Sequence, residues 1–210
     1  ALIEMNFLGI NDVLALRGDP PKGSRVFIPD PGGHRNTSEL VQQISDMNRG
    51  HYLDPDLKNT APTSFCIGVA GYPEKHFEAP NLKSDMVNLK RKVDAGACYI
   101  VTQMFFDNEK FYSFRDALRA MGVTVPLIPG IKPVSAVTDV NLLPQTFHID
   151  MPEELVHELS KCRTDDEARE VGIEWATAQS RDLLKNEVPG IHYYTLGRSD
   201  NIARIVKASF

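Results

Sequence analysis

Five short apolar runs, each followed by a segment with helical periodicity, constrain the fold of this chain most strongly. Uninterrupted apolar runs are typical of strands buried on both faces, and such strands belong to parallel sheets that are covered by helices. The predicted strands are residues 12–16, 64–70, 98–103, 125–128 and 191–195. The predicted helices are residues 38–49, 83–95, 108–121, 152–162, 165–186 and 200–208. The alternation predicts an α/β fold.

A parallel sheet of this kind is either part of a barrel or doubly wound. Polar side chains follow nearly every predicted strand, as they do on the active-site face of a barrel. A doubly wound sheet concentrates them at one switch point, and no G-x-G-x-x-G follows any predicted strand. We therefore expect residues 1–210 to be one domain, an incomplete TIM (β/α)8 barrel.

Composition excludes several classes of protein. A chain of 210 residues with 42% hydrophobic content suits one soluble domain, and its net charge of −5 argues against a nucleic-acid partner. No apolar run is long enough to cross a membrane, and the amino terminus lacks a signal-peptide pattern. The three cysteines share no metal-ligand spacing. We expect no metal site, no membrane partner and a cytoplasmic location.

The first candidate site residues end the first predicted strand, within the sequence DVLALRGDPPKG at 12–23. Arg17, Gly18 and Asp19 bring a cation, a permissive backbone and a carboxylate to the carboxyl end of a strand, where ligands bind in such folds. The alternative is an ordinary polar turn. This segment alone leaves both the ligand-site and the polar-turn interpretation open.

The second group follows the second predicted strand. Tyr72 is able to stack on a flat ligand, and His76 is able to donate to a phosphate or ribose oxygen, unless the two side chains only cover a surface loop. Asp85, Asn88 and Lys92 form one polar stripe on the next predicted helix. This stripe lines a ligand groove or is simply a solvated face.

A third group lies at the later strand ends. The amide of Gln103 suits recognition of a pterin-like ring, or is satisfied by nearby backbone. Tyr194 and Arg198 suit an aromatic acid, although Arg198 could equally serve the last helix. The turn PGIKPV at 129–134 offers no clear catalytic group. Many orienting groups without an evident nucleophile indicate that a cofactor performs the chemistry.

Together these motifs resemble the methylenetetrahydrofolate reductase family. They are ALRGDPP at 15–21, VAGYPEKHFEA at 69–79, LKRKVDAGA at 89–97, TQMFFD at 102–107, PGIKPVS at 129–135 and HYYTLGR at 192–198. The resemblance implies a barrel that binds FAD noncovalently and reduces 5,10-methylenetetrahydrofolate to the 5-methyl form with NAD(P)H as hydride donor. It also implies a homo-oligomer.

The resemblance assigns roles to individual residues. The FAD-binding residues would be Leu16, Arg17, Gly18, Asp19, Ala70, Tyr72, His76, Ala79, Asp85, Asn88, Arg91 and Lys92. The cationic groups and His76 would hold the ribityl-diphosphate, and Asp19 would be catalytic, lying near the flavin pyrimidine. Gln103, Tyr194 and Arg198 would face folate and nicotinamide, which share one site in a ping-pong enzyme.

The chain also departs from the family pattern. Asn36 stands where the family has an aromatic residue, and Asp139 and Leu143 stand where polar and aromatic substrate contacts are expected. Pro144 is expected to interrupt the helix there. The family's first three βα units, which carry a catalytic glutamate, have no counterpart before Ala1.

The missing units lead to an expectation about activity. The chain would supply strands four to eight of the barrel and would be inactive alone. One alternative is a noncatalytic folate- or flavin-binding or assembly module derived from such a barrel. Another is a different barrel enzyme that uses a pterin or a flavin.

Overall fold

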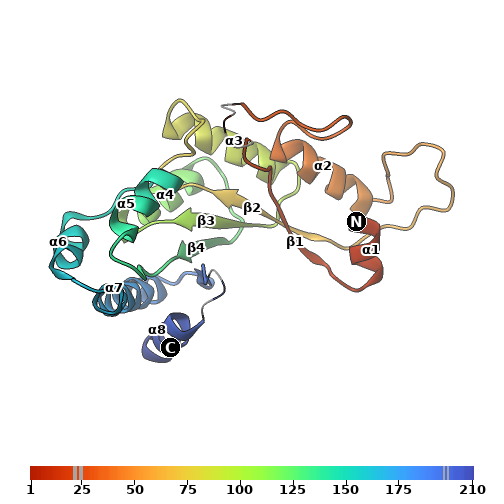
Figure 1. The fold of residues 1–210 in the computed structure, drawn as a ribbon. Coiled ribbons are helices and arrows are strands. Elements are labelled where there is room, and N and C mark those ends of the chain that lie inside the picture. Colours follow the sequence, from red (N-terminus) through yellow and green to blue (C-terminus); the bar gives the residue numbers. More distant parts are fainter. Residues whose placement is uncertain (21–22, 24–25, 196, 198) are drawn as a thin grey trace.

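The computed structural model describes residues 1–210 except 21–22, 24–25, 196 and 198. Within these residues the strands form one parallel sheet in the order β1-β2-β3-β4-β5 (Figure 1). The strands are β1 (Asp12–Ala15), β2 (Cys66–Gly71), β3 (Tyr99–Met104), β4 (Leu127–Ile131) and β5 (His192–Tyr193). The helices are α1 (Leu2–Phe7), α2 (Thr37–Asn48), α3 (Leu82–Asp94), α4 (Asn108–Ala120), α5 (Asp139–Phe147), α6 (Glu153–Lys161), α7 (Asp165–Lys185) and α8 (Asp200–Ser209). All five predicted strands are confirmed.

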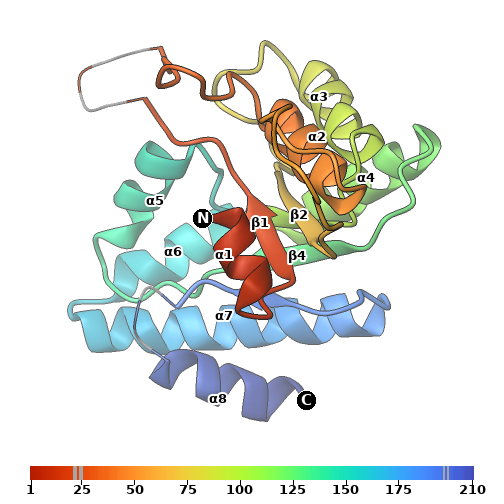
Figure 2. The ribbon, with the colours of Figure 1, turned by 90° about the vertical axis from the view of Figure 1, so that its right-hand side faces the viewer.

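The strand order decides between the two parallel architectures. Each strand pairs with the strand before it in sequence, so the sheet has no point at which its order reverses. Right-handed crossovers that all run the same way place their helices on one face of the sheet. Figures 1 and 2 show α2, α3 and α4 along that face. The fold is a curled half-barrel, compatible with part of a TIM barrel, and the doubly wound alternative is excluded.

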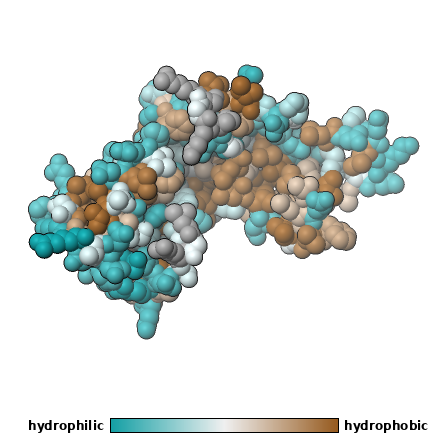
Figure 3. Space-filling view, viewed as in Figure 1, coloured by the Kyte–Doolittle hydropathy of each residue, from teal (hydrophilic) through white to brown (hydrophobic). Residues whose placement is uncertain are grey.

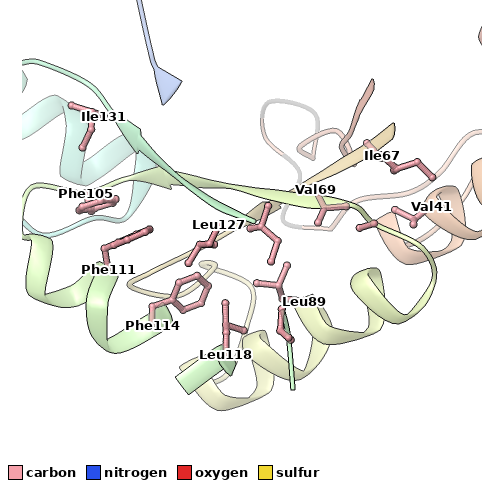
Figure 4. Packing of buried hydrophobic residues seen from close by; sticks show 14 of the residues in the cluster. Val41, Ile67, Val69, Leu89, Phe105, Phe111, Phe114, Leu118, Leu127 and Ile131 are labelled. Atoms are coloured by element: carbon pink, nitrogen blue, oxygen red, sulfur yellow. The ribbon is translucent and has the colours of Figure 1, made fainter. Parts of the chain in front are cut away.

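The main hydrophobic core lies between the sheet and these helices (Figure 4). Leu89 of α3 and Phe111 of α4 pack there with Val69 of β2. The rings of Phe105 and Phe111 stack with centroids 5.4 Å apart. Phe106 belongs to a second buried cluster, which includes residues of α5, α6 and α7. The expectation that Phe105 and Phe106 fill core is confirmed.

The first strand is less buried than its sequence predicts. The side chains of Leu14 and Leu16 are 43% and 53% exposed, although β2 and β3 are mostly buried. Within the described ranges β1 is an edge strand that pairs only with β2. Val13 and Ala15 pack into the core, while the alternating leucines face away from it. The prediction of burial on both faces is therefore wrong for β1, and Figure 3 shows apolar surface in this part of the molecule.

The six predicted helices are confirmed to within a few residues, but two described helices, α1 and α5, are not among them. The expectation that Pro144 interrupts the helix is wrong. Helix α5 continues through Pro144 and ends at a left-handed cap residue, His148, where φ is 54°. The helix is fixed at its start by Asp139, whose Oδ2 accepts hydrogen bonds from the main-chain N–H groups of Ser135 (2.8 Å) and Ala136 (3.2 Å). Of the helices that the structure describes, none has the length and apolar content needed to span a membrane.

Candidate functional site

A cavity of about 330 Å³, called here the first cavity, lies at the carboxyl ends of β1 and β2 and against α3. Eleven of the twelve predicted cofactor residues line it, and Gly18 does not. The eleven are Leu16, Arg17, Asp19, Ala70, Tyr72, His76, Ala79, Asp85, Asn88, Arg91 and Lys92. The parallel sheet accounts for this convergence, because the ends of neighbouring parallel strands meet at one edge.

The segment after β1 presents its guanidinium and carboxylate to this cavity. Arg17 forms an ion pair of 2.6 Å with Glu78, and its guanidinium lies 4.8 Å from the ring centre of Phe27. Asp19 lines the same cavity. A Cβ atom built on Gly18 would come no closer than 3.9 Å to the Phe27 ring. No close approach within the described residues therefore requires glycine at position 18.

The loop after β2 holds His76 in a defined orientation. Its main-chain N–H donates to Asp85 Oδ2 at 2.9 Å, and its Nδ1 accepts from the main-chain N–H of Glu78 at 3.2 Å. The ring packs edge to face on Tyr72, with centroids 4.7 Å apart. Burial lowers the pKa of His76, although Asp85 and Glu78 act against this shift. A neutral imidazole whose Nδ1 is an acceptor carries its proton on Nε2 and is a donor there.

Lys92 brings a partly buried ammonium group to the cavity from α3. Its Nζ donates to the main-chain oxygen of Ala70 at 2.9 Å, which leaves two further N–H donors. Burial lowers the pKa of Lys92, and the carboxylate of Asp85 partly opposes this effect. Burial also raises the pKa of Tyr72 to about 12, with Asp85 and Asp19 adding to it. Tyr72 is therefore a neutral ring with a hydroxyl donor at ordinary pH.

One wall of the first cavity lies outside the predicted FAD-binding set, although the family resemblance places Asn36 where an aromatic residue would help to cover the flavin. Asn36, Thr37 and Ser38, at the start of α2, line it together with Glu78 and Pro80. The carboxylate of Glu39 accepts from the main-chain N–H of Asn36 at 3.3 Å, as expected for a capping box. The spacing of Asn36 and Glu39 could have predicted this helix start, but not that it would reach the cavity.

Two of the predicted substrate residues, Gln103 and Tyr194, do not line the first cavity. Gln103 Oε1 accepts from the main-chain N–H of Met104 at 3.0 Å, so its oxygen is satisfied locally. The hydroxyl of Tyr194 donates to the main-chain oxygen of Thr102 at 2.9 Å. Arg198 lies outside the described residues. Gln103 and Tyr194 are therefore not part of the cavity that the FAD set lines, although Tyr194 is close enough to Tyr72 to help raise its pKa.

Tyr194 instead lines a second cavity, of about 620 Å³. Lys132, Arg169 and residues at the start of α8 line this second cavity too. Lys132 belongs to the turn in which the sequence suggested no catalytic group. In the described ranges no cluster of three or more His, Cys, Asp or Glu side chains is arranged to hold a metal ion.

Comparison with known proteins identifies the chain's relatives. The family model described as "Methylenetetrahydrofolate reductase" matches residues 1–209. A protein of Arabidopsis thaliana described as "Methylenetetrahydrofolate reductase (NADH) 1" is 38% identical over 198 residues, 90% of this chain and 31% of its own length. The "5,10-methylenetetrahydrofolate reductase" of Escherichia coli (strain K12) is 35% identical over 193 residues, 91% of this chain and 58% of its own.

The relatives are longer than this chain. The match covers 28% of a probable methylenetetrahydrofolate reductase (NADPH) of Caenorhabditis elegans. A solved structure of an uncharacterized protein from Clostridium thermocellum, described as binding two copies of 5-methyl-5,6,7,8-tetrahydrofolic acid, matches 70% of this chain and 53% of its own. Its TM-score of 0.46 and identity of 17% are too low to support an argument.

Proposed function

Because the chain belongs to the methylenetetrahydrofolate reductase family, we propose that its first cavity binds FAD as part of an enzyme that reduces 5,10-methylenetetrahydrofolate to 5-methyltetrahydrofolate with NAD(P)H. The convergence of eleven residues on one cavity carries this proposal. They come from segments far apart in sequence, and the family resemblance assigned all of them to the same ligand.

The chemistry of the cavity fits the charged part of FAD. A diphosphate needs cations and hydrogen-bond donors, and Arg91 and Lys92 line the wall formed by α3. Lys92 has two N–H donors beyond its bond to Ala70, and neutral His76 has its Nε2–H. These three residues would hold the diphosphate and its neighbouring ribose oxygens.

The remaining residues of the first cavity would orient the ring system. When bound, FAD supplies the hydride relay between the nicotinamide and the folate. Asp19 would lie near the flavin pyrimidine as the predicted catalytic carboxylate, where its charge tunes the ring. The ring of Tyr72, fixed against His76, would give a flat neutral surface for part of the cofactor.

We further propose that β1–β5 are strands four to eight of an eight-stranded barrel. The chain spans about a third of the length of its plant and animal relatives, and 58% of the bacterial one. The predicted glutamate that protonates the folate would then lie outside this chain. The 210 residues would bind flavin without turning over substrate.

Flavin binding tests the proposal directly. Purified chain mixed with FAD should retain an absorption band at about 450 nm after removal of free flavin. Lys92→Met should weaken binding tenfold or more, because it removes a partly buried cation from the cavity wall. Lys90→Met is the matched control, since Lys90 lies on the same helix but pairs with Asp94 at 2.6 Å outside the cavity. A colourless chain that cannot be reconstituted, or equal effects of the two variants, would overturn the flavin site.

The alternative is a noncatalytic module that binds folate or flavin, or that serves assembly. Flavin binding without reduction of methylenetetrahydrofolate by NADH or NADPH supports the proposed part of an enzyme. Tight folate binding by a chain that takes no flavin supports the module. Steady turnover by the 210 residues contradicts both the module and the proposed inactivity.

A further inference from the structure

We infer that Lys132 is an anion-binding residue, and that the second cavity holds the carboxylate or phosphate group of a ligand against its ammonium group. The first and second cavities have no lining residue in common. The inference therefore does not depend on FAD binding at the first cavity.

The fold gives Lys132 an unusual position. It directly follows β4, most of whose residues are buried, and it is itself only 7% exposed. It nevertheless lines a cavity of about 620 Å³. Within the part of the chain that the structure describes, its ammonium group donates one hydrogen bond, to the main-chain oxygen of Pro133 at 3.2 Å. An ammonium group has three donors, so two are left for another partner.

Lys132 lacks the partner that a buried charge ordinarily has. Among the described residues no carboxylate lies within ion-pair distance of it, and Asp139 acts on it only from farther away. Oδ2 of Asp139 is occupied by Ser135, through both its main-chain N–H and its hydroxyl. Burial accordingly lowers the pKa of Lys132. An unpaired buried charge costs free energy, and a bound anion would offset that cost.

Among the described residues, the other charged side chains that line the second cavity are already paired or are acidic. Arg204 makes two contacts of 2.6 Å with Glu170, and Arg169 donates to Asp166 at 2.9 Å. Asp200, in the first turn of α8, also lines the cavity. Its negative charge disfavours a doubly charged anion there. We therefore expect a monocarboxylate to bind more tightly than phosphate.

Two probes distinguish the sources of the anionic group. The 210-residue chain is titrated with benzoate and, separately, with inorganic phosphate, and binding is followed by calorimetry and by the ¹³Cε resonance of Lys132. Saturation with anion should raise the pH midpoint of that resonance, which a purely structural lysine would not show. Lys132→Met should weaken binding tenfold or more. Lys161→Met, on the exposed face of α6, should leave it unchanged.

Controls keep the inference falsifiable. Met has nearly the shape of the lysine stem, so Lys132→Met should fold with at least wild-type stability. Lys132→Arg keeps the charge and should retain part of the affinity. Binding of either probe that requires Lys132 supports the inference. No binding of either probe at tens of millimolar, or equal affinity of wild type and Lys132→Met, overturns it. A flavin spectrum recorded on the same samples reports separately on the first cavity.

Discussion

The imidazole of His148 packs on the ring of Phe77, with ring centres 5.2 Å apart. This contact joins the loop after β2 to the corner between α5 and α6. The ring of His76 contacts the same phenyl ring at 4.7 Å. Phe77 is therefore the link between a residue of the first cavity and a helix end more than seventy positions away in sequence.

Phe77→Ala should destabilise the chain by about 1–3 kcal/mol, because it removes two aromatic contacts of roughly 0.5–1.5 kcal/mol each. Urea unfolding measures this loss, and flavin binding should weaken in the same variant. Phe7→Ala is the control, since Phe7 is 90% exposed on α1. Equal losses in the two variants would show that the contacts of Phe77 contribute nothing.

A second link joins the same two regions through charge. Glu74 Oε2 accepts from the main-chain N–H of Asp150 at 2.7 Å, and Oε1 lies 3.1 Å from Nζ of Lys110 in an ion pair without good hydrogen-bond alignment. Burial raises the pKa of Glu74 above its ordinary 4.5, against the opposing effects of Asp150 N–H and Lys110. The folded chain therefore holds this proton more tightly than the unfolded chain does.

Glu74→Gln should change how stability depends on pH. Since the folded pKa is raised, the wild-type chain should lose stability relative to the variant as pH rises from about 4.5 to the folded pKa, and then stay level. Chemical unfolding of both proteins at several pH values measures the difference. A wild-type advantage that grows with pH would show that the ion pair with Lys110 outweighs burial.

His76 should show the opposite dependence. Its pKa lies below the ordinary 6.5, so its contribution to stability is present above 6.5 and is lost as pH falls to the folded pKa. Nitrogen-15 NMR should find a titration midpoint below 6.5 and, in the neutral ring, a proton on Nε2. His76→Gln should remove this loss of stability as pH falls below 6.5. A neutral ring protonated on Nδ1 would contradict the recorded bond from Glu78.

Leu14→Lys should reduce self-association of the chain without lowering its stability. Leu14 is 43% exposed on an edge strand, and such strands pair readily with other chains unless a charge prevents it. Light scattering over a range of concentrations measures the effect. Leu142→Lys places the same charge on α5 at an exposed leucine and should leave association unchanged. A compact oligomer that persists in Leu14→Lys would place its interface elsewhere.

The sheet could be predicted from sequence because apolar runs are a local property of the chain. Ile67 and Val69 are buried as their run predicts. Leu14 belongs to an equally apolar run, but the burial of a strand also depends on the strands and helices beside it. Among the described strands β1 pairs only with β2, so Leu14 stays partly exposed. The prediction that Pro144 would interrupt the helix was wrong for a related reason. Proline lacks a main-chain N–H donor, but the turn closed by Asp139 and the core around Leu143 stabilise α5 nevertheless.

The family resemblance, and not the strand pattern alone, named the residues of the first cavity as one set. Arg17, Asp19 and Tyr72 follow strand ends, which a parallel sheet brings together, whereas Lys92 and its neighbours reach the cavity from α3. Lys132 also follows a strand, but a single lysine in a proline-rich turn gives no sign of being buried. Its significance comes from having no ion-pair partner among the residues that the structure describes. That is a property of three-dimensional surroundings, which sequence patterns do not report.

The sequential strand order has a consequence for how the chain comes to be folded. Because each described strand pairs only with its neighbours in sequence, no pairing waits for a segment made much later by the ribosome. Contacts between adjacent units keep loop-closure costs low. The sheet can therefore lengthen by one strand at a time during synthesis, with the newest strand always at its growing edge.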